Sequence, residues 1–108
     1  MNRTTIEVIK SHGRAFRLGI NAILLDYAPD AVIISPSGVH QGHAQIRPFF
    51  ESEIMNFPTG FWEALKTRRL EVHGEYGYFL WEALPWYPLG CDSFHVRDGL
   101  IRFQSSTI

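Results

Sequence analysis

The hydrophobic pattern of the chain changes its period once, from a helical period in the first half to a strand-like period in the second. Near the start, apolar residues recur three and four positions apart, which predicts a helix capped by Thr4 or Thr5 and ending near Gly19. Beyond position 60 the pattern is that of strands separated by short turns. Helices that precede strands, instead of alternating with them, predict an α+β fold with helices on one face of an antiparallel sheet.

Two further helices and one short strand are predicted before the long strands begin. A short helix over 21–27 has Asn21 as its N-cap and is stopped by the proline two residues beyond its end. The β-branched run 31–34 predicts a buried strand, followed by a turn. The helical period returns over 43–57, where Pro48 lies beyond the first turn and predicts a kink or a later helix start.

Turn residues divide the second half into four predicted strands. The breaks are a glycine turn after His73, a Pro-Trp-Tyr-Pro loop and an Asp-Gly turn after Arg97. The predicted strands cover 61–73, 76–84, 90–97 and 100–107.

Composition limits both the size of the fold and its partners. The 108 residues, of which 45% are hydrophobic, are enough for one domain, 1–108, with its own core. Ten Lys and Arg residues against eleven Asp and Glu leave no basic surplus, which argues against a nucleic-acid partner. No apolar run is long enough for a membrane span or a secretory signal, so we expect no membrane partner and a cytoplasmic location.

The cysteine and histidine residues do not predict a metal or redox site. Cys91 has no partner for a disulfide, which suits a reducing compartment. His40 and His43 lie three apart, but Gly42 interrupts the helix that would align them, and no third ligand is evident. We therefore expect no bound metal and no cofactor.

Three segments together resemble the SnoaL-like and ketosteroid isomerase-like branch of the nuclear transport factor 2-like superfamily. They are Leu25–Ile33, Gly42–Phe50 and Asp92–Ile101, and their order along the chain is similar to that of this fold. The resemblance covers nearly the whole chain. It implies a cone-shaped, cystatin-like α+β fold, in which a curved, mostly antiparallel (mixed) sheet wraps the N-terminal helices around an apolar pocket.

The resemblance also implies a homodimer formed through the outer face of the sheet. The segment 76–84 agrees with this, because its residues of both parities are apolar or aromatic, so that both faces of the strand need cover. One chain of this length has helices for one face. We therefore expect a second copy to cover the other.

Ketosteroid isomerases use a carboxylate base together with a tyrosine and a protonated acid as hydrogen-bond donors. By resemblance, the base position is occupied here by Ser35, which cannot remove a proton from carbon at neutral pH, and the donor tyrosine by Ser11. Steroid isomerase activity is therefore not expected. The third position matches, because Asp92 corresponds to the protonated acid.

Asp92 is the leading candidate for a catalytic residue. Strand alternation places it on one face with Phe94 and Val96, and apolar neighbours raise the pKa of a carboxyl group by desolvation. It could act as a general acid, a hydrogen-bond donor or a base. The alternative is a structural role, in which Asp92 only pairs with a buried polar group.

Glu82 and Tyr27 are the other catalytic candidates. Glu82 shares a parity with Tyr78 and Leu80, and the resemblance turns that face toward the pocket, where Glu82 and Asp92 could share a proton. The alternative is a salt bridge with an arginine, or a rim position. Tyr27 ends the short helix, and its hydroxyl is expected to bind Asp92 or, alternatively, to lie at the rim.

The turn at Asp98–Gly99 decides which residues of the last strand join Asp92. A two-residue loop pairs Val96 with Ile101, whereas a three-residue loop pairs Val96 with Leu100 and brings Gln104 inward. The resemblance favours the three-residue loop and makes Gln104 a candidate ligand donor; a surface position is the alternative. The remaining candidate ligand-binding residues are Ser35, His40, Trp62, Tyr78 and Phe94.

These features favour a pocket that binds a small hydrophobic or cyclic carbonyl compound. Proton transfer by Asp92, with Glu82 or Tyr27, would then serve an isomerisation, a cyclisation or a dehydration. A non-catalytic ligand-binding or dimerisation module of the same fold is the alternative, since a fold alone does not assign a function.

Overall fold

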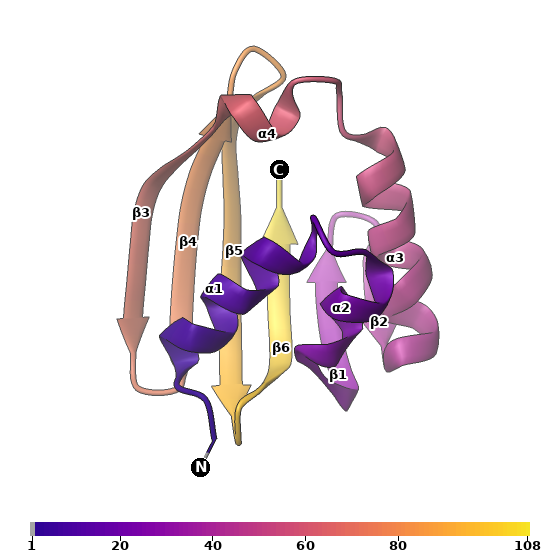
Figure 1. The fold of residues 1–108 in the computed structure, drawn as a ribbon, viewed down its shortest axis with the longest axis vertical. Coiled ribbons are helices and arrows are strands. Elements are labelled where there is room, and N and C mark those ends of the chain that lie inside the picture. Colours follow the sequence, from indigo (N-terminus) through magenta and orange to yellow (C-terminus); the bar gives the residue numbers. More distant parts are fainter. Residues whose placement is uncertain (1) are drawn as a thin grey trace.

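The protein folds as four helices and one six-stranded sheet within residues 2–108, which the computed structural model describes (Figure 1). In chain order these are α1 (Thr5–Ala15), α2 (Ile20–Leu25), β1 (Tyr27–Ser35), β2 (Gly38–Gln41), α3 (His43–Asn56), α4 (Phe61–Ala64), β3 (Leu65–His73), β4 (Tyr76–Ala83), β5 (Tyr87–Arg97) and β6 (Leu100–Thr107).

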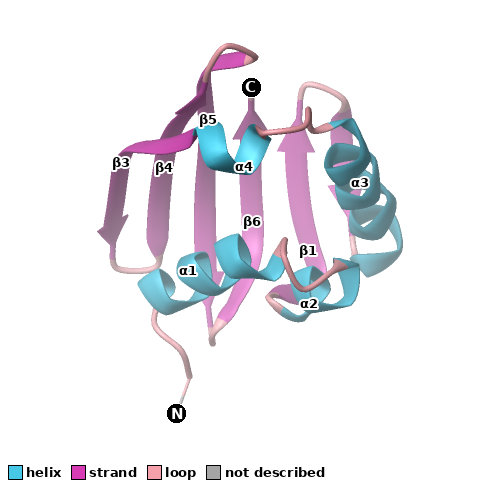
Figure 2. Ribbon diagram, turned by 45° about the horizontal axis from the view of Figure 1, so that its top comes forward, coloured by secondary structure: helices cyan, strands magenta, loops and turns pink. Residues whose placement is uncertain are grey.

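The sheet is mixed, with the strand order β2-β1-β6-β5-β4-β3. All neighbouring strands are antiparallel except β1 and β6, which run parallel. The last strand of the chain therefore lies beside the first. The helices lie on one face, and the sheet curves around them without closing on itself (Figure 2). The α+β fold predicted from the sequence is confirmed.

The first helix begins where its capping residues predict, but it ends early. The Thr4 side chain accepts a hydrogen bond from the Glu7 amide, and the Glu7 carboxylate accepts one from the Thr4 amide. The helix stops at Ala15, four residues before the predicted end at Gly19. Its buried stripe, which packs against the sheet, consists of Thr5, Val8, Ile9, His12 and Ala15.

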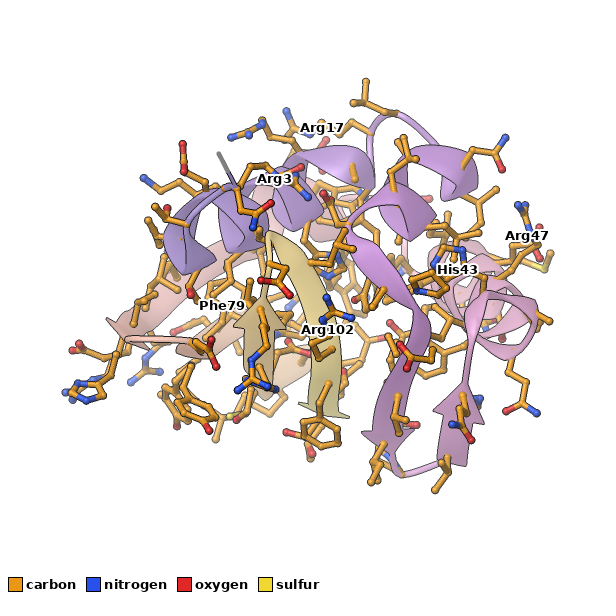
Figure 3. The ribbon with its side chains drawn as sticks, turned by 90° about the horizontal axis from the view of Figure 1, so that it is seen from below. Arg3, Arg17, His43, Arg47, Phe79 and Arg102 are labelled. Atoms are coloured by element: carbon orange, nitrogen blue, oxygen red, sulfur yellow. The ribbon has the colours of Figure 1, made fainter. Side chains whose placement is uncertain are left out.

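The segment between α1 and α3 contains more strand than predicted. The helix α2 begins after Gly19, so the predicted cap at Asn21 is wrong; the Asn21 amide oxygen instead accepts a hydrogen bond from Arg47 of α3 at 2.8 Å. Tyr27 begins β1 rather than ending a helix. Figure 3 labels His43 and Arg47 on α3, and His43 donates from Nε2 to the Tyr27 carbonyl oxygen at 2.9 Å.

Two further boundaries differ from the predicted ones. The helix α3 begins at His43 and continues through Pro48, so the alternative of a later start is wrong. The predicted strand over 61–73 begins with the short helix α4, and only its remainder is strand β3. Aromatic contacts explain this helix, because Phe61 stacks on Phe57 with ring centroids 4.1 Å apart. No helix within residues 2–108 has the length and apolarity needed to cross a membrane.

Candidate functional site

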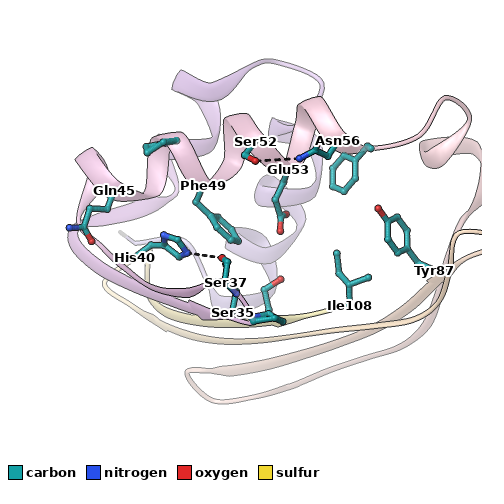
Figure 4. A pocket seen from close by; sticks show the side chains of 14 residues that line it. Ser35, Ser37, His40, Gln45, Phe49, Ser52, Glu53, Asn56, Tyr87 and Ile108 are labelled. Atoms are coloured by element: carbon teal, nitrogen blue, oxygen red, sulfur yellow. Dashed lines mark hydrogen bonds between the residues drawn. The ribbon is translucent and has the colours of Figure 1, made fainter.

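Two adjoining cavities lie between the helices and the curved sheet. The inner cavity, of about 580 Å³, is bounded by α1, α3, α4 and the strands β3 to β6. The rim cavity, of about 520 Å³, lies between β2, α3 and the end of β6 (Figure 4). The two cavities share the side chains of Glu53, Phe57, Ser106 and Ile108.

Asp92 lies in the wall of the inner cavity, on strand β5. Its Oδ2 accepts a hydrogen bond from Trp81 Nε1 at 2.9 Å, and its Oδ1 accepts one from Gln104 Nε2 at 3.1 Å. The amide oxygen of Gln104 accepts a hydrogen bond from the hydroxyl of buried Tyr27. A continuous chain of hydrogen bonds therefore runs from Tyr27 through Gln104 and Asp92 to Trp81.

Burial raises the pKa of Asp92 above its ordinary value, because the surrounding apolar groups disfavour the charged form. Hydrogen bonds from Trp81, Ser106 and Gln104 favour the carboxylate and oppose this increase. Burial, with a smaller contribution from the charge of Asp92, raises the pKa of Tyr27 well above its ordinary value, so Tyr27 remains a hydroxyl donor. Asp92 thus combines an apolar site with donors that hold it in one orientation.

A tight turn and a bulge bring Gln104 to Asp92. Asp98 and Gly99 both have positive φ angles, of 54° and 75°, as a two-residue type I′ turn requires. Val96 therefore pairs with Ile101, and the predicted pairing of Val96 with Leu100 is wrong.

The inward position of Gln104 is nevertheless observed. Arg102 is an extra residue between the pairs Val96–Ile101 and His95–Phe103, and this bulge reverses the parity of the rest of β6. Phe94 then pairs with Gln104, and Asp92 pairs with Ser106. The bulge therefore places Gln104 and Ser106 on the face of Asp92.

A glycine on β5 gives Trp81 its position beside Asp92. A Cβ atom at Gly90 would lie 2.1 Å from Cε2 of the Trp81 indole, so only glycine leaves room for the ring. Trp81 and Gly90 face each other in the β4–β5 register. The indole therefore lies across the neighbouring strand with its N–H toward the carboxylate.

Solved structures with the same architecture cover almost the entire chain. No family model and no curated protein matches the sequence. Among solved structures, a protein from Sinorhizobium meliloti assigned as a polyketide cyclase has a TM-score of 0.73 and 19% identity, with 93% of each chain covered. An NTF2-like protein of unknown function from Cytophaga hutchinsonii has a TM-score of 0.75 and 12% identity, with 98% of this chain and 90% of that chain covered.

A third structure belongs to a protein from Agrobacterium tumefaciens assigned as an isomerase of the SnoaL-like family. It has a TM-score of 0.70 and 14% identity, with 95% of each chain covered. The chain has the nuclear transport factor 2-like (NTF2-like) fold. SnoaL-like proteins are among its structural neighbours, in agreement with the resemblance of the sequence.

Glu82 and Tyr78 lie on the opposite face of the NTF2-like sheet from Asp92. Phe79 pairs directly with Asp92, so the odd-numbered residues of β4 share the face of Asp92 and the even-numbered residues point away. Glu82 accepts a hydrogen bond from Arg68 at 3.0 Å, and Tyr78 is exposed. The predictions that Glu82 shares a proton with Asp92 and that Tyr78 lines the pocket are therefore wrong. The sequence could not decide between the faces because both are apolar.

The remaining predicted residues divide between the two cavities. Trp62, Phe94 and Gln104 line the inner cavity with Asp92. Ser35 and His40 line the rim cavity, where Ser37 lies 2.8 Å from the Ser35 hydroxyl and 3.1 Å from His40 Nε2 (Figure 4). Tyr27 makes its hydrogen bond to Gln104 and not directly to Asp92. No cluster of His, Cys, Asp or Glu in residues 2–108 has the arrangement of a metal site.

Sequence analysis missed Glu53, which lines both cavities from α3. Figure 4 shows its side chain extending from the helix toward the sheet. Burial, with a smaller contribution from the charge of Asp92, raises its pKa to about 7. The sequence pattern could have identified Glu53, because it lies three residues after Phe50 and four before Phe57, within the apolar stripe of the helix.

His12 of α1 is a second buried ionisable group of the inner cavity. The rings of Phe16, Tyr27, Phe50 and Phe94 surround it, with centroids between 5.0 and 5.7 Å away. Burial lowers its pKa to about 4, so the imidazole is neutral at physiological pH. Its Nδ1 is the one buried side-chain nitrogen or oxygen of residues 2–108 without a hydrogen-bond partner.

Proposed function

We propose that this protein is an acid–base enzyme that binds a small hydrophobic or cyclic carbonyl compound in the inner cavity. Asp92 moves a proton to or from a carbon atom of the bound compound, in an isomerisation, a cyclisation or a dehydration. The observation that carries the proposal is a carboxyl group in the wall of an apolar cavity, with its pKa raised by burial.

The cavity wall supports the class of ligand. Most of the side chains that surround Asp92 are aromatic or aliphatic, and they favour a flat, uncharged molecule over a polar one. The aromatic members of this wall are Phe16, Phe50, Phe57, Phe61, Trp62, Phe79, Trp81 and Phe94. The lining also holds polar and charged side chains, and among these Asp92, Glu53 and Gln104 are the groups that would orient a ligand.

The structural neighbours support the class of reaction. Two of them are assigned as a polyketide cyclase and as an isomerase of the SnoaL-like family, and cyclisation and isomerisation are two of the reactions proposed here. A carboxylate of raised pKa suits this chemistry, because a general base works best when its pKa approaches the operating pH. The likeness of fold alone does not transfer the activity.

A non-catalytic binding module is the second candidate. The resemblance favours it, because it implies that Ser35 stands at the position of the usual base. The structure favours it as well, because both oxygens of Asp92 already accept hydrogen bonds from the protein. In that case the cavity binds a ligand and Asp92 only organises Trp81 and Gln104.

The test is proton exchange on a simple cyclic ketone, 2-tetralone, followed by NMR in deuterated water. We expect the wild-type protein to accelerate deuterium incorporation beside the carbonyl group, and Asp92→Asn to lower the rate about a hundredfold, since the amide cannot accept the proton. Glu82→Gln is the matched control, because it removes a carboxylate from the outer face of the same sheet.

The outcomes separate the two candidates. Equal rates for wild type and Asp92→Asn would exclude Asp92 as the base. Binding of 2-tetralone, seen as a change in tryptophan fluorescence, without any exchange above that of the buffer would contradict the enzyme and support the binding module. Trp62 and Trp81 line the inner cavity and make this binding measurement possible.

A further inference from the structure

The two cavities meet at one acidic side chain that the sequence did not single out. Glu53 belongs to the lining of both the inner and the rim cavity, whereas Asp92 lines only the inner one. We propose that Glu53 is a second catalytic residue, which donates a proton to the carbonyl oxygen of the bound compound while Asp92 removes a proton from the adjacent carbon. This inference rests on the function proposed above.

The position of Glu53 opposite the sheet suits a pair of groups that act on two sides of one ligand. Glu53 extends from α3 toward the strands, as Figure 4 shows, and Asp92 projects from β5 on the helix-covered face. A compound that fills the inner cavity therefore has one carboxyl group on the sheet side and the other on the helix side. Ser106, opposite Asp92 in the sheet register, also lines both cavities.

Glu53 also differs from every other acidic side chain in residues 2–108. Those that are not exposed all have hydrogen-bond partners: Asp26 binds Arg3 and Ser11, Glu75 binds His95 and Arg97, Glu82 binds Arg68, and Asp92 binds Trp81 and Gln104. Glu53 is half-buried and makes no hydrogen bond or salt bridge within the described chain. A carboxyl group left without a partner in such a place is costly unless it is protonated or meets a ligand.

The surroundings favour the protonated form more strongly in Glu53 than in Asp92. Asp92 receives hydrogen bonds that favour its charged form, whereas nothing in the described chain donates to Glu53. Burial and the negative charge of Asp92 raise the pKa of Glu53 to about 7. Two carboxyl groups whose surroundings give them different pKa values are suited to act as an acid and a base.

The other ionisable groups around the cavities do not reverse this order. His12 is neutral because burial lowers its pKa to about 4, and Tyr27 keeps its proton because burial raises its pKa. Burial and the charge of Asp92 are the two causes of the raised pKa of Glu53. The ionisable groups that line the two cavities, apart from Asp92 and Glu53, are Lys10, His12, Arg14, Arg17, His40 and Tyr87.

The proton balance of the step is complete without any other reactant. Asp92 takes a proton from the carbon beside the carbonyl group, and the electrons of that C–H bond form a carbon–carbon double bond. The carbonyl electrons move to oxygen, which takes the proton of Glu53, so that the product is a neutral enol. The protonated Asp92 then returns its proton to the same carbon or to another, and the enol hydroxyl returns its proton to Glu53, which regenerates the Asp92 carboxylate and the Glu53 carboxylic acid.

The first experiment measures the proton affinity of Glu53 directly. Carbon-13 NMR of the side-chain carboxyl groups follows each titration from about pH 4 to about pH 9, and Glu53→Gln identifies the resonance. We expect Glu53 to titrate near 7, and its pKa to fall in Asp92→Asn because that variant removes a nearby negative charge. Titration of Glu53 in the ordinary range of a glutamate overturns the proposal.

Glu51 provides a matched control on the same helix. It is exposed and lines neither cavity, so Glu51→Gln should remove one carboxyl resonance and leave the Glu53 titration unchanged. A shift of the Glu53 titration in Glu51→Gln as large as that in Asp92→Asn would show that Asp92 is not its specific partner and would contradict the pairing.

The second experiment tests the catalytic role with the exchange of 2-tetralone. In wild type the rate should fall as the pH rises through about 7, because Glu53 then loses the proton that it donates. Glu53→Gln should lower the rate about a hundredfold and abolish this fall, with the KM little changed, while Glu51→Gln behaves as wild type.

The outcomes keep this proposal distinct from the proposed function. Loss of exchange in Asp92→Asn, with an unchanged rate and pH profile in Glu53→Gln, overturns the role of Glu53 and leaves Asp92 as the base. A rate that rises through pH 7 in wild type overturns the assignment of Glu53 as the acid. If wild type catalyses no exchange of 2-tetralone, both the enzyme and the catalytic role of Glu53 are contradicted, even where Glu53 titrates near 7.

Discussion

Three ionisable side chains of the inner cavity differ in their hydrogen-bond partners but are all affected by burial. Asp92 is half-buried with donors on both oxygens, Glu53 is half-buried without a partner, and His12 is enclosed by aromatic rings with Nδ1 unpaired. Burial disfavours the charged form in each case, so the pKa rises for the acids and falls for the base. The site is therefore built to hold uncharged groups beside one oriented carboxylate.

His12 should make the protein lose stability in mild acid. Its pKa is about 4 in the folded protein and about 6.5 in the unfolded chain, so the unfolded state binds the proton first. The contribution of neutral His12 is complete above about pH 6.5 and is lost as the pH falls toward 4, at a cost on the order of 3 kcal/mol. His12→Phe keeps a planar ring and removes the ionisable group.

We expect urea unfolding to show that His12→Phe loses about 2 kcal/mol less stability than wild type between neutral pH and about pH 4.5. The acids of the cavity are present in both proteins, so their own pH dependence cancels in the comparison. His73→Gln, at an exposed histidine of β3, is the control and should follow wild type. Parallel pH profiles for His12→Phe and wild type would show that His12 does not titrate in this way.

Residue patterns predicted part of the site and could have predicted more. Alternation along β5 was enough to place Asp92 beside Phe94, because that strand has one polar face. Glu53 could have been found from its position in the apolar stripe of α3. Glu82 could not be placed, since both faces of β4 are apolar and only the register with β5 selects the inward one.

At the scale of elements, the β5–β6 hairpin shows why the register escapes a sequence pattern. The Asp-Gly turn indicates the two-residue loop, yet that loop alone would bring Phe103 inward beside Asp92. The extra residue at Arg102 reverses the parity and brings Gln104 there instead. Bulges depend on twist and on packing between strands, and the local sequence around Arg102 does not predict a bulge.

The packing of β4 against β5 depends on the missing side chain at Gly90. In Gly90→Ala the new methyl group would overlap the Trp81 indole, which is held by its hydrogen bond to Asp92 and by packing against Phe61. We expect a loss of roughly 1–3 kcal/mol in the free energy of unfolding, with a change in tryptophan fluorescence as the ring moves. Chemical denaturation and the emission spectrum measure the two effects.

Gly13 is the control for this substitution. It is exposed in α1, and an added Cβ meets no atom within 4 Å, so Gly13→Ala should stabilise the protein by about 0.5–1 kcal/mol through helix propensity. Equal stability of Gly90→Ala and wild type, with an unchanged emission spectrum, would mean that the position of the Trp81 indole does not depend on a glycine at position 90.

At the scale of the whole molecule, the order of helices and strands was predictable and indicated an α+β fold, and the resemblance implied the NTF2-like form of it. The short elements were not predictable: α4 and β2 depend on contacts that form only when distant segments meet. Phe61 of α4 packs on Trp81 of β4, and Val39 and His40 of β2 pair with β1. Short apolar segments take the structure that their tertiary contacts favour, rather than the one that their own propensity suggests.

The outer face of the sheet carries apolar side chains that no element of residues 2–108 covers. Tyr78 on β4 is 38% exposed and Ile34 on β1 is 45% exposed, and half-buried Leu80 on β4 and Phe103 on β6 share this face. The four helices all lie on the other face (Figure 2). We propose that two copies of the chain pair through this outer face, because a surface of this kind is stabilised by removal from water.

A charge within that face should separate the copies. Leu80→Glu places a carboxylate opposite its symmetry-related neighbour, where burial without a partner is costly. We expect sedimentation velocity at micromolar concentration to give a dimer for wild type and a monomer for Leu80→Glu. Met55→Glu introduces the same charge on α3, at a side chain 83% exposed and away from the outer face, and should remain dimeric. A monomeric wild type would exclude the dimer, and the exposed apolar face would then need another occupant.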